Sequence, residues 1–114
     1  MHTKLALLIL LCSSSVLAQD VAKVNPKSIT VKLDNARVRV MEAVLKPGQK
    51  EALHSHPASI VYVIAGGTSR NHTPDGKVSD VTLKAGQTVY REPLTHWAEN
   101  IGKTTMRLIV VELK

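Results

Sequence analysis

The fold is decided by residues 48–67, which read GQKEALHSHPASIVYVIAGG, a histidine pair followed by a run of β-branched residues. The run over residues 59–65 has the apolar composition typical of a buried or half-buried strand. His54 and His56 are separated by one residue, and the two-residue period of a strand points both side chains to the same face. The stretch therefore predicts β-structure that carries two imidazoles on one strand face.

Short segments of the same kind recur along the chain, and after residue 18 no helical periodicity extends over more than a few residues. The separators have turn chemistry, as in Thr73-Pro74-Asp75-Gly76, where proline presets the turn and glycine accepts a positive φ. We expect nine strands, over residues 28–33, 36–45, 52–56, 59–65, 68–72, 78–83, 88–92, 96–99 and 105–113. This pattern predicts an all-β sandwich or barrel, and a closed barrel would also hide the strand edges.

The composition fits one all-β domain and argues against several function classes. The 114 residues suffice for one domain, and the aromatic residues are Tyr62, Tyr90 and Trp97, so the core must consist mainly of Val, Ile and Leu. The net charge of +6 is spread over single Lys and Arg residues without interleaved aromatics, which argues against nucleic-acid binding. The sequence has no G-x-S-x-G elbow and no phosphate-binding glycine loop, so serine hydrolases and phosphoryl transfer are disfavoured.

The first 18 residues have the pattern of a secretory signal peptide. Lys4 precedes the apolar run 5–12, and the small residues that follow end at Ala18. The apolar run is too short for a membrane anchor, since a spanning helix needs about 20 apolar residues. We therefore expect cleavage before Gln19 and a secreted or periplasmic protein.

After cleavage the chain would consist of a loose lead-in at residues 19–27 and one folded domain at residues 28–114. The single cysteine, Cys12, would leave with the signal peptide, so no disulfide would stabilise this small domain. The strands must therefore close their own sheet edges and pack efficiently.

Three histidines are the candidate metal ligands. His54 and His56 share a strand face, whereas His96 lies on a later predicted strand and only the fold could bring it to them. Imidazole is the commonest protein metal ligand, and a site of three imidazoles suits Fe, Mn, Zn, Ni or Cu. The alternative is that the pair lies on the surface and that His96 is a buried histidine bonded to the backbone. His72, directly before a turn, is expected to be an exposed loop residue and not a ligand.

The histidines lie in two stretches that resemble the motifs of the cupin family. Residues 48–66 are similar to the first motif, G-x5-H-x-H-x3,4-E-x6-G, with its histidines at His54 and His56. Residues 86–100 are similar to the second motif, G-x5-P-x-G-x2-H-x3-N, with its histidine at His96. The resemblance implies a small single-domain cupin with a double-stranded β-helix, or jelly-roll barrel. It also implies a divalent transition metal held at one barrel mouth by His54, His56 and His96.

The acidic ligand of the first motif is absent, because the positions that could hold it are Ser59, Ile60 and Val61. A site of three histidines is our preferred interpretation, and it would leave open positions for an anionic or oxygen-chelating ligand. Alternatively, Glu51 or Glu92 supplies the missing acid. In a third interpretation the barrel has lost the metal and its mouth is a plain ligand pocket.

Two function classes follow from these alternatives. The chain is either a metal-dependent enzyme acting on a small molecule, as a dioxygenase, isomerase or lyase, or a non-catalytic cupin that binds a small ligand without metal. Arg91 could pair with a substrate carboxylate at the mouth, although we expect it to point outward into solvent. Tyr62 is a further candidate contact, although we expect it to pack in the core with its phenol near the rim.

The resemblance has two finer implications. Residues 91–93, 99–102 and 110–113 are similar to segments of small cupins linked with β-alanine metabolism. Because cupins often dimerise through sheet faces or swapped N-terminal strands, residues 28–45 are a candidate homodimer interface.

Overall fold

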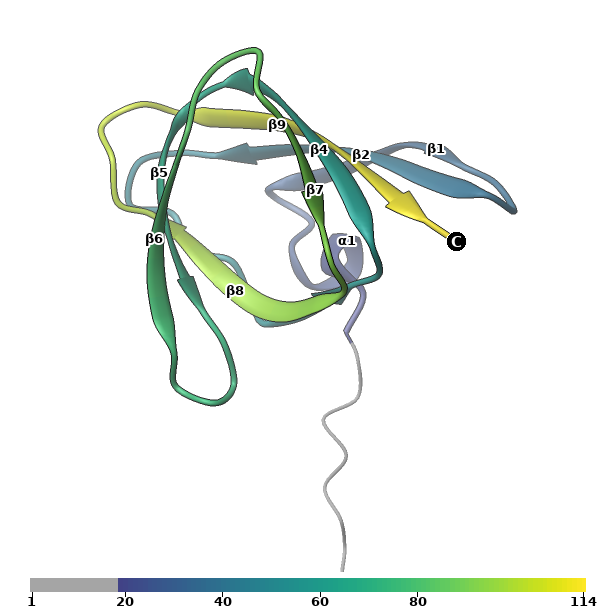
Figure 1. The fold of residues 1–114 in the computed structure, drawn as a ribbon, viewed down its shortest axis with the longest axis horizontal. Coiled ribbons are helices and arrows are strands. Elements are labelled where there is room, and N and C mark those ends of the chain that lie inside the picture. Colours follow the sequence, from purple (N-terminus) through teal and green to yellow (C-terminus); the bar gives the residue numbers. More distant parts are fainter. Residues whose placement is uncertain (1–18) are drawn as a thin grey trace, which may run out of the picture.

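The computed structural model describes residues 19–114, so the predicted signal peptide lies outside the described residues. Within this range, nine strands form two antiparallel sheets that curve around a common interior (Figure 1). The five-stranded sheet has the order β1-β2-β9-β4-β7 and the four-stranded sheet the order β3-β8-β5-β6. The elements are α1 (Val21–Val24), β1 (Ile29–Asp34), β2 (Val38–Leu45), β3 (His54–His56), β4 (Ser59–Ala65), β5 (Gly67–His72), β6 (Val78–Leu83), β7 (Thr88–Arg91), β8 (Leu94–Asn100) and β9 (Met106–Leu113). The expected all-β class is confirmed.

The observed strands follow the expected ones closely. β4 and β6 begin and end at the expected residues, and Gly76 takes a φ of 85° in the turn between β5 and β6. The largest differences are in β3, which is paired only over His54–His56, and in β8, which begins at Leu94 rather than at His96. Among the described residues, no helix is both long and apolar enough to cross a membrane.

The lead-in is packed, which corrects the expectation that residues 19–27 would be loose. Asp20 caps α1 by accepting a hydrogen bond from the backbone N–H of Ala22 at 2.9 Å. Val21 is 0% exposed and belongs to a core cluster with Met41. The helix contacts β1 and β3, one strand from each sheet. The lead-in is therefore part of the folded unit.

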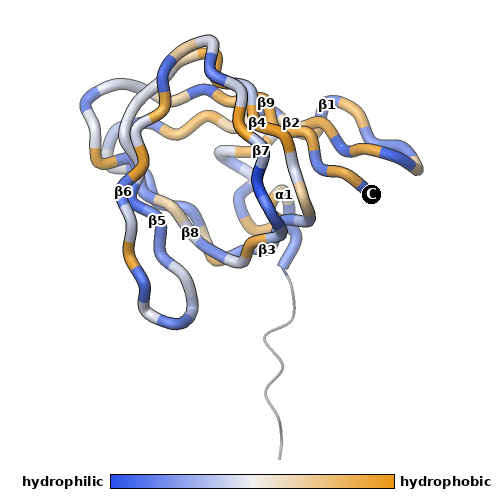
Figure 2. The backbone as a smooth tube through the Cα atoms, in the orientation of Figure 1, coloured by the Kyte–Doolittle hydropathy of each residue, from blue (hydrophilic) through white to orange (hydrophobic). Residues whose placement is uncertain are grey.

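The inner face of the five-stranded sheet is polar in one row and apolar in the rows that follow. Strand register places Arg39, Glu112, Ser59 and Arg91 side by side across β2, β9, β4 and β7. The following rows hold the buried apolar side chains Met41, Leu45, Val61, Val63, Met106 and Val110. Figure 2 shows how strongly hydrophobic residues concentrate in β4 and β9. The polar row therefore marks the end of the barrel where a site can lie.

The outer face of the same sheet is also rich in apolar side chains. Ile60, Tyr62, Ile64 and Tyr90 are all exposed, and Tyr62 is 47% exposed. Val61 and Val63 alternate with them and are 0% exposed. The expectation that Tyr62 packs in the core or contacts a ligand is therefore wrong, because Tyr62 lies on the face of β4 that points away from the interior.

Candidate metal centre

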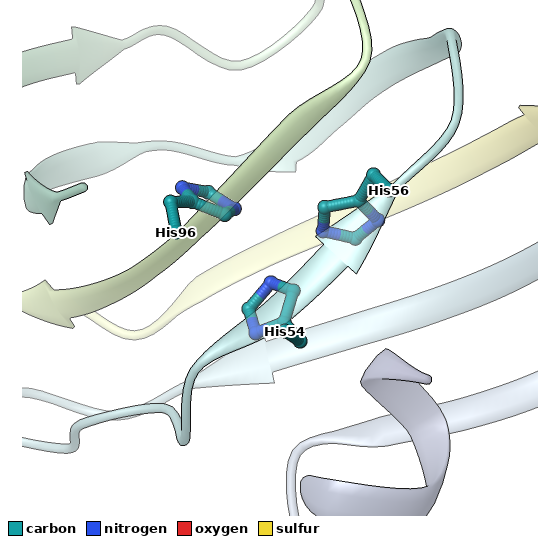
Figure 3. Close-up of side chains that lie close together, drawn as sticks. All are labelled: His54, His56 and His96. Atoms are coloured by element: carbon teal, nitrogen blue, oxygen red, sulfur yellow. The ribbon is translucent and has the colours of Figure 1, made fainter. Parts of the chain in front are cut away.

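Strands β3 and β8 bring the three histidines together. The strands pair antiparallel with His54 opposite His96, and His56 follows on the same face of β3. Each side chain offers a ligand nitrogen, and these atoms all lie within 4.8 Å of one another. The rings are turned toward one another (Figure 3). The expected convergence is confirmed, and the surface alternative for the pair is excluded because His54 is 1% exposed and the side chain of His56 is 12% exposed.

All three rings are held through the same atom. Each Nδ1 lies within hydrogen-bond distance of a protein oxygen: His54 to the carbonyl of Ala52 (2.7 Å), His56 to Oε2 of Glu112 (2.7 Å) and His96 to Oδ1 of Asn71 (3.1 Å). Because these oxygens can only accept, each Nδ1 carries the hydrogen in this network. In its neutral form each ring therefore has its lone pair on Nε2, the arrangement typical of metal-binding histidines.

The buried Nε2 atoms show that the cluster fits a metal. Nε2 of His54 and Nε2 of His96 are buried and have no hydrogen-bond partner within residues 19–114. A buried polar atom without a partner costs about 1–3 kcal/mol, and a metal ion would satisfy both atoms at once. Burial lowers the pKa of His54 to about 4 and that of His96 to about 3. Both rings are thus neutral near pH 7, the state that binds metals.

Glu112 orients His56 and is itself held by Arg39. Its Oε1 accepts hydrogen bonds from Nε of Arg39 at 3.0 Å and from Nη2 of Arg39 at 2.8 Å. Burial alone would raise the pKa of Glu112, but the hydrogen bonds from His56 and Arg39 outweigh it and hold the pKa below its ordinary value. Arg39 is paired in turn with Asp20 of the lead-in. An ionised Glu112 keeps the hydrogen on Nδ1 of His56 and leaves Nε2 available.

His54 is also positioned from the lead-in. Asn25 is 6% exposed, and its Oδ1 accepts a hydrogen bond from the backbone N–H of Ala52 at 2.7 Å. The carbonyl of the same residue, Ala52, accepts from His54. Asn25 therefore fixes the backbone that fixes the ring.

Neither glutamate considered from the sequence joins the histidines as a ligand. Within residues 19–114, the side chains that converge as a metal-binding group are the three histidines alone. Glu92 is exposed at the rim of the mouth. Glu51 does point inward, because it lines a small cavity inside the barrel, described below. Its backbone N–H donates a hydrogen bond to the carbonyl of Ala98 at 2.8 Å. Burial raises the pKa of Glu51 to about 7.

Two adjoining cavities lie beside the histidines. The inner cavity measures about 60 Å³ and is lined by His56, His96 and Glu51 among mostly apolar residues. The outer one, the mouth of the barrel, measures about 400 Å³, within the range of small-molecule sites. Arg91 and His96 line both cavities. The expectation that Arg91 points outward into solvent is therefore wrong, because its place on β7 aims it into the interior.

The sequence and the fold place this site in a known family. A family model described as a cupin domain matches residues 41–112. The chain is a member of the cupin family. No curated protein matches it.

Solved structures agree with this assignment. A cupin domain from Bordetella pertussis Tohama I is 30% identical, and the match covers 75% of this chain and 91% of the other, with a TM-score of 0.69. A conserved protein with a double-stranded β-helix domain from Klebsiella pneumoniae is 30% identical, with 75% of each chain covered and a TM-score of 0.57. A predicted oxalate decarboxylase from Thermotoga maritima is 25% identical over 75% of this chain and 79% of the other, with a TM-score of 0.53. The double-stranded β-helix expected for this cupin is confirmed.

Another histidine of this cupin lies outside the cluster. His72 is the last residue of β5 rather than a loop residue, and it stacks on Trp97 with ring centroids 3.7 Å apart. Its Nε2 lies 3.2 Å from Oε1 of Glu99. His72 therefore ends the strand expected over residues 68–72, and the exposed loop position also predicted for this histidine is wrong.

The sequence interpretation missed the residues that orient the rings. Asn71 and Glu112 contact the histidines through oxygen atoms. Asn25 holds the backbone of Ala52, and its Nδ2 also lies 3.4 Å from Nδ1 of His54. One signal was present for Glu112, which is a single carboxylate in the apolar run 106–113. In a cupin barrel this strand is buried, and a charged side chain on it needs a partner in the interior.

Proposed function

We propose that this cupin is a secreted or periplasmic protein that binds one divalent transition metal through Nε2 of His54, His56 and His96. The observation that carries the proposal is the common orientation of the rings, each with Nδ1 held by a protein oxygen. The unsatisfied Nε2 atoms of His54 and His96 support it independently. Secretion rests on the pattern of residues 1–18.

An enzyme is favoured over a carrier because a titratable group other than the histidines, the carboxyl of Glu51, faces the interior. A bound metal would supply Lewis-acid or redox chemistry for a dioxygenase, isomerase or lyase reaction on a small molecule. The chain itself contributes Glu51, which lines the same inner cavity as His56 and His96. Its carboxyl is therefore placed to exchange a proton with a ligand bound there. The mouth supplies the volume for such a ligand.

A second function is favoured by one specific observation, the absence of the acidic ligand from the converging group. A cupin that binds a small ligand without metal needs only the mouth and its lining. The chain is similar to small cupins linked with β-alanine metabolism and to a predicted oxalate decarboxylase. This similarity supports a small acid as the ligand, both for a metal-dependent enzyme and for a metal-free binding protein.

The metal content of the purified protein tests the proposal. The full-length chain is expressed without a histidine tag, loaded separately with Fe(II), Mn, Zn, Ni and Cu(II), desalted and measured by elemental mass spectrometry. We expect about one metal per chain, lost in His96→Ala and retained in His72→Ala, the matched histidine outside the cluster. The intact mass checks cleavage before Gln19.

Either of two results would refute the metal centre. The first is wild-type protein that takes up none of the five metals. The second is uptake that falls equally in His96→Ala and in His72→Ala, which would point to adventitious surface binding. A metal-free protein that still binds small ligands would support the second function.

A further inference from the structure

Two arginines lie in the polar row of the five-stranded sheet, and they differ in their partners. Arg39 is bound by Glu112 and Asp20, so its charge is compensated within the protein. Arg91, at the β7 end of the row, donates no hydrogen bond to a side chain of residues 19–114 and forms no ion pair with any of them. The carboxyl of Glu51 acts on it through space, without a hydrogen bond. One arginine of the row is structural, and the other is available.

Arg91 is only partly exposed to water. It lies across from Ser59 in the β4–β7 pair, and Ser59 is 2% exposed. Burial lowers the pKa of Arg91 from its ordinary value, although a guanidinium keeps its charge in proteins. A partly buried cation without a partner is unfavourable unless something compensates it. The missing compensation points to an anionic ligand.

The position of Arg91 defines what such a ligand must look like. Arg91 and His96 both line the mouth, so a molecule in the mouth touches the guanidinium and the histidine cluster together. A planar, bidentate anion matches the guanidinium best, and a carboxylate has that geometry. The rest of the mouth lining includes the polar residues Asn71, Thr73, Ser79 and Glu92, and it has an apolar part formed by Val81, Val89 and Leu94. A short aliphatic chain would fit against these residues.

We propose that Arg91 binds the carboxylate of a small aliphatic carboxylic acid in the barrel mouth, with the rest of the molecule directed toward the histidine cluster. The inference deepens the proposed function by naming its substrate class, and it rests on that function only for the role of the histidines. The binding of the carboxylate itself needs no metal.

Nuclear magnetic resonance of the full chain in the metal-free state tests the inference. Butanoate is titrated against butanamide, its neutral analogue of nearly the same shape, while the Nε–Hε signal of Arg91 is followed. We expect butanoate to shift this signal and to bind about tenfold or more tightly than butanamide, because a charge-assisted pair is replaced by a neutral one. Arg91→Gln should remove the preference.

A matched control is Arg70→Gln, which removes an exposed arginine paired with Asp80 on the outer face of the other sheet. This variant should keep the preference for butanoate. The inference is overturned if butanoate and butanamide bind equally, or if neither binds with a dissociation constant of about 50 millimolar or below. It is also overturned if Arg70→Gln loses as much of the preference for butanoate as Arg91→Gln does.

The outcome is independent of the metal proposal. Metal content is measured on Arg91→Gln and on the wild-type protein in the same experiment. Carboxylate binding without metal uptake would leave Arg91 assigned and refute the metal centre. Metal uptake without a preference for butanoate would support the metal centre and refute the role of Arg91.

Discussion

The acid response of the metal-free protein depends on buried groups whose titration differs between the folded and unfolded states. His54 and His96 have pKa values of about 4 and about 3 in the folded protein, against an ordinary value of 6.5. Their folded pKa values are lowered, so the stability they contribute is present above pH 6.5 and is lost as the pH falls toward the folded values. From pH 7 to pH 5, each histidine costs about 2 kcal/mol of unfolding free energy.

Glu51 acts in the opposite direction. Its pKa is raised from 4.5 to about 7 in the folded protein. A raised folded pKa contributes stability below the unfolded value and loses it as the pH rises through the folded value. From pH 7 to pH 5, Glu51 therefore adds about 2 kcal/mol. Two histidines outweigh one glutamate, and the net loss over this interval is about 2 kcal/mol.

Two variants separate these contributions. In Glu51→Gln the opposing group is gone, so the loss from pH 7 to pH 5 should grow to about 4 kcal/mol. In His96→Asn one of the two histidines is gone, so the loss should fall to about zero. Urea denaturation at both pH values in the presence of a chelator measures each difference. The reasoning is refuted if Glu51→Gln and His96→Asn change the pH dependence in the same direction, since the structure assigns them opposite signs.

Two further outcomes follow from single contacts. Glu112→Gln removes the charge that holds Nδ1 of His56, and it should lower metal affinity about 10- to 100-fold. Competition with a chromophoric chelator measures the affinity. An unchanged affinity in Glu112→Gln, or an equal drop in His72→Ala, would contradict this role of Glu112. Gly66→Ala would place a Cβ 2.2 Å from the carbonyl oxygen of Leu83, a backbone atom that cannot move aside, so we expect a drop of the melting temperature by several degrees, about 4–8 °C for each kcal/mol lost. A melting temperature within 1 °C (roughly the scatter of such scans) of the wild-type value would show that Gly66 and Leu83 approach less closely than this.

The strands and the histidine cluster were predictable because each rests on local pattern. The run over residues 59–65 and the turn at Pro74 and Gly76 define β4, β5 and β6 without reference to the rest of the chain. His54 and His56 share a face by alternation alone. Joining them to His96 required more than alternation, and the spacing of the two cupin motifs provided it.

The errors arose where alternation does not distinguish the two faces of a strand. In β4 the apolar residues Val61 and Tyr62 lie on opposite faces, so the pattern cannot say which one is inside. The same holds in β7, where Val89 and Tyr90 are both apolar and Arg91 lies on the Val89 face. The pairing of β4 with β9 and β7 decides the question, since it aligns Val61 with Val110 and Val89 in one buried row. That pairing is a property of the barrel and not of either segment.

The polar end of the barrel is where local rules of stability are broken, and the breaks coincide. Among residues 19–114, two buried Nε2 atoms lack partners, a partly buried arginine lacks an anion, and the half-buried Glu51 has a raised pKa. Each is unfavourable for the folded chain by itself, and the apolar rows at the other end must offset them. A single ligand set, a cation on the histidines and an anion on Arg91, would compensate the unpartnered groups together. The arrangement is therefore better explained by binding than by folding, because folding alone would favour apolar side chains at the same positions.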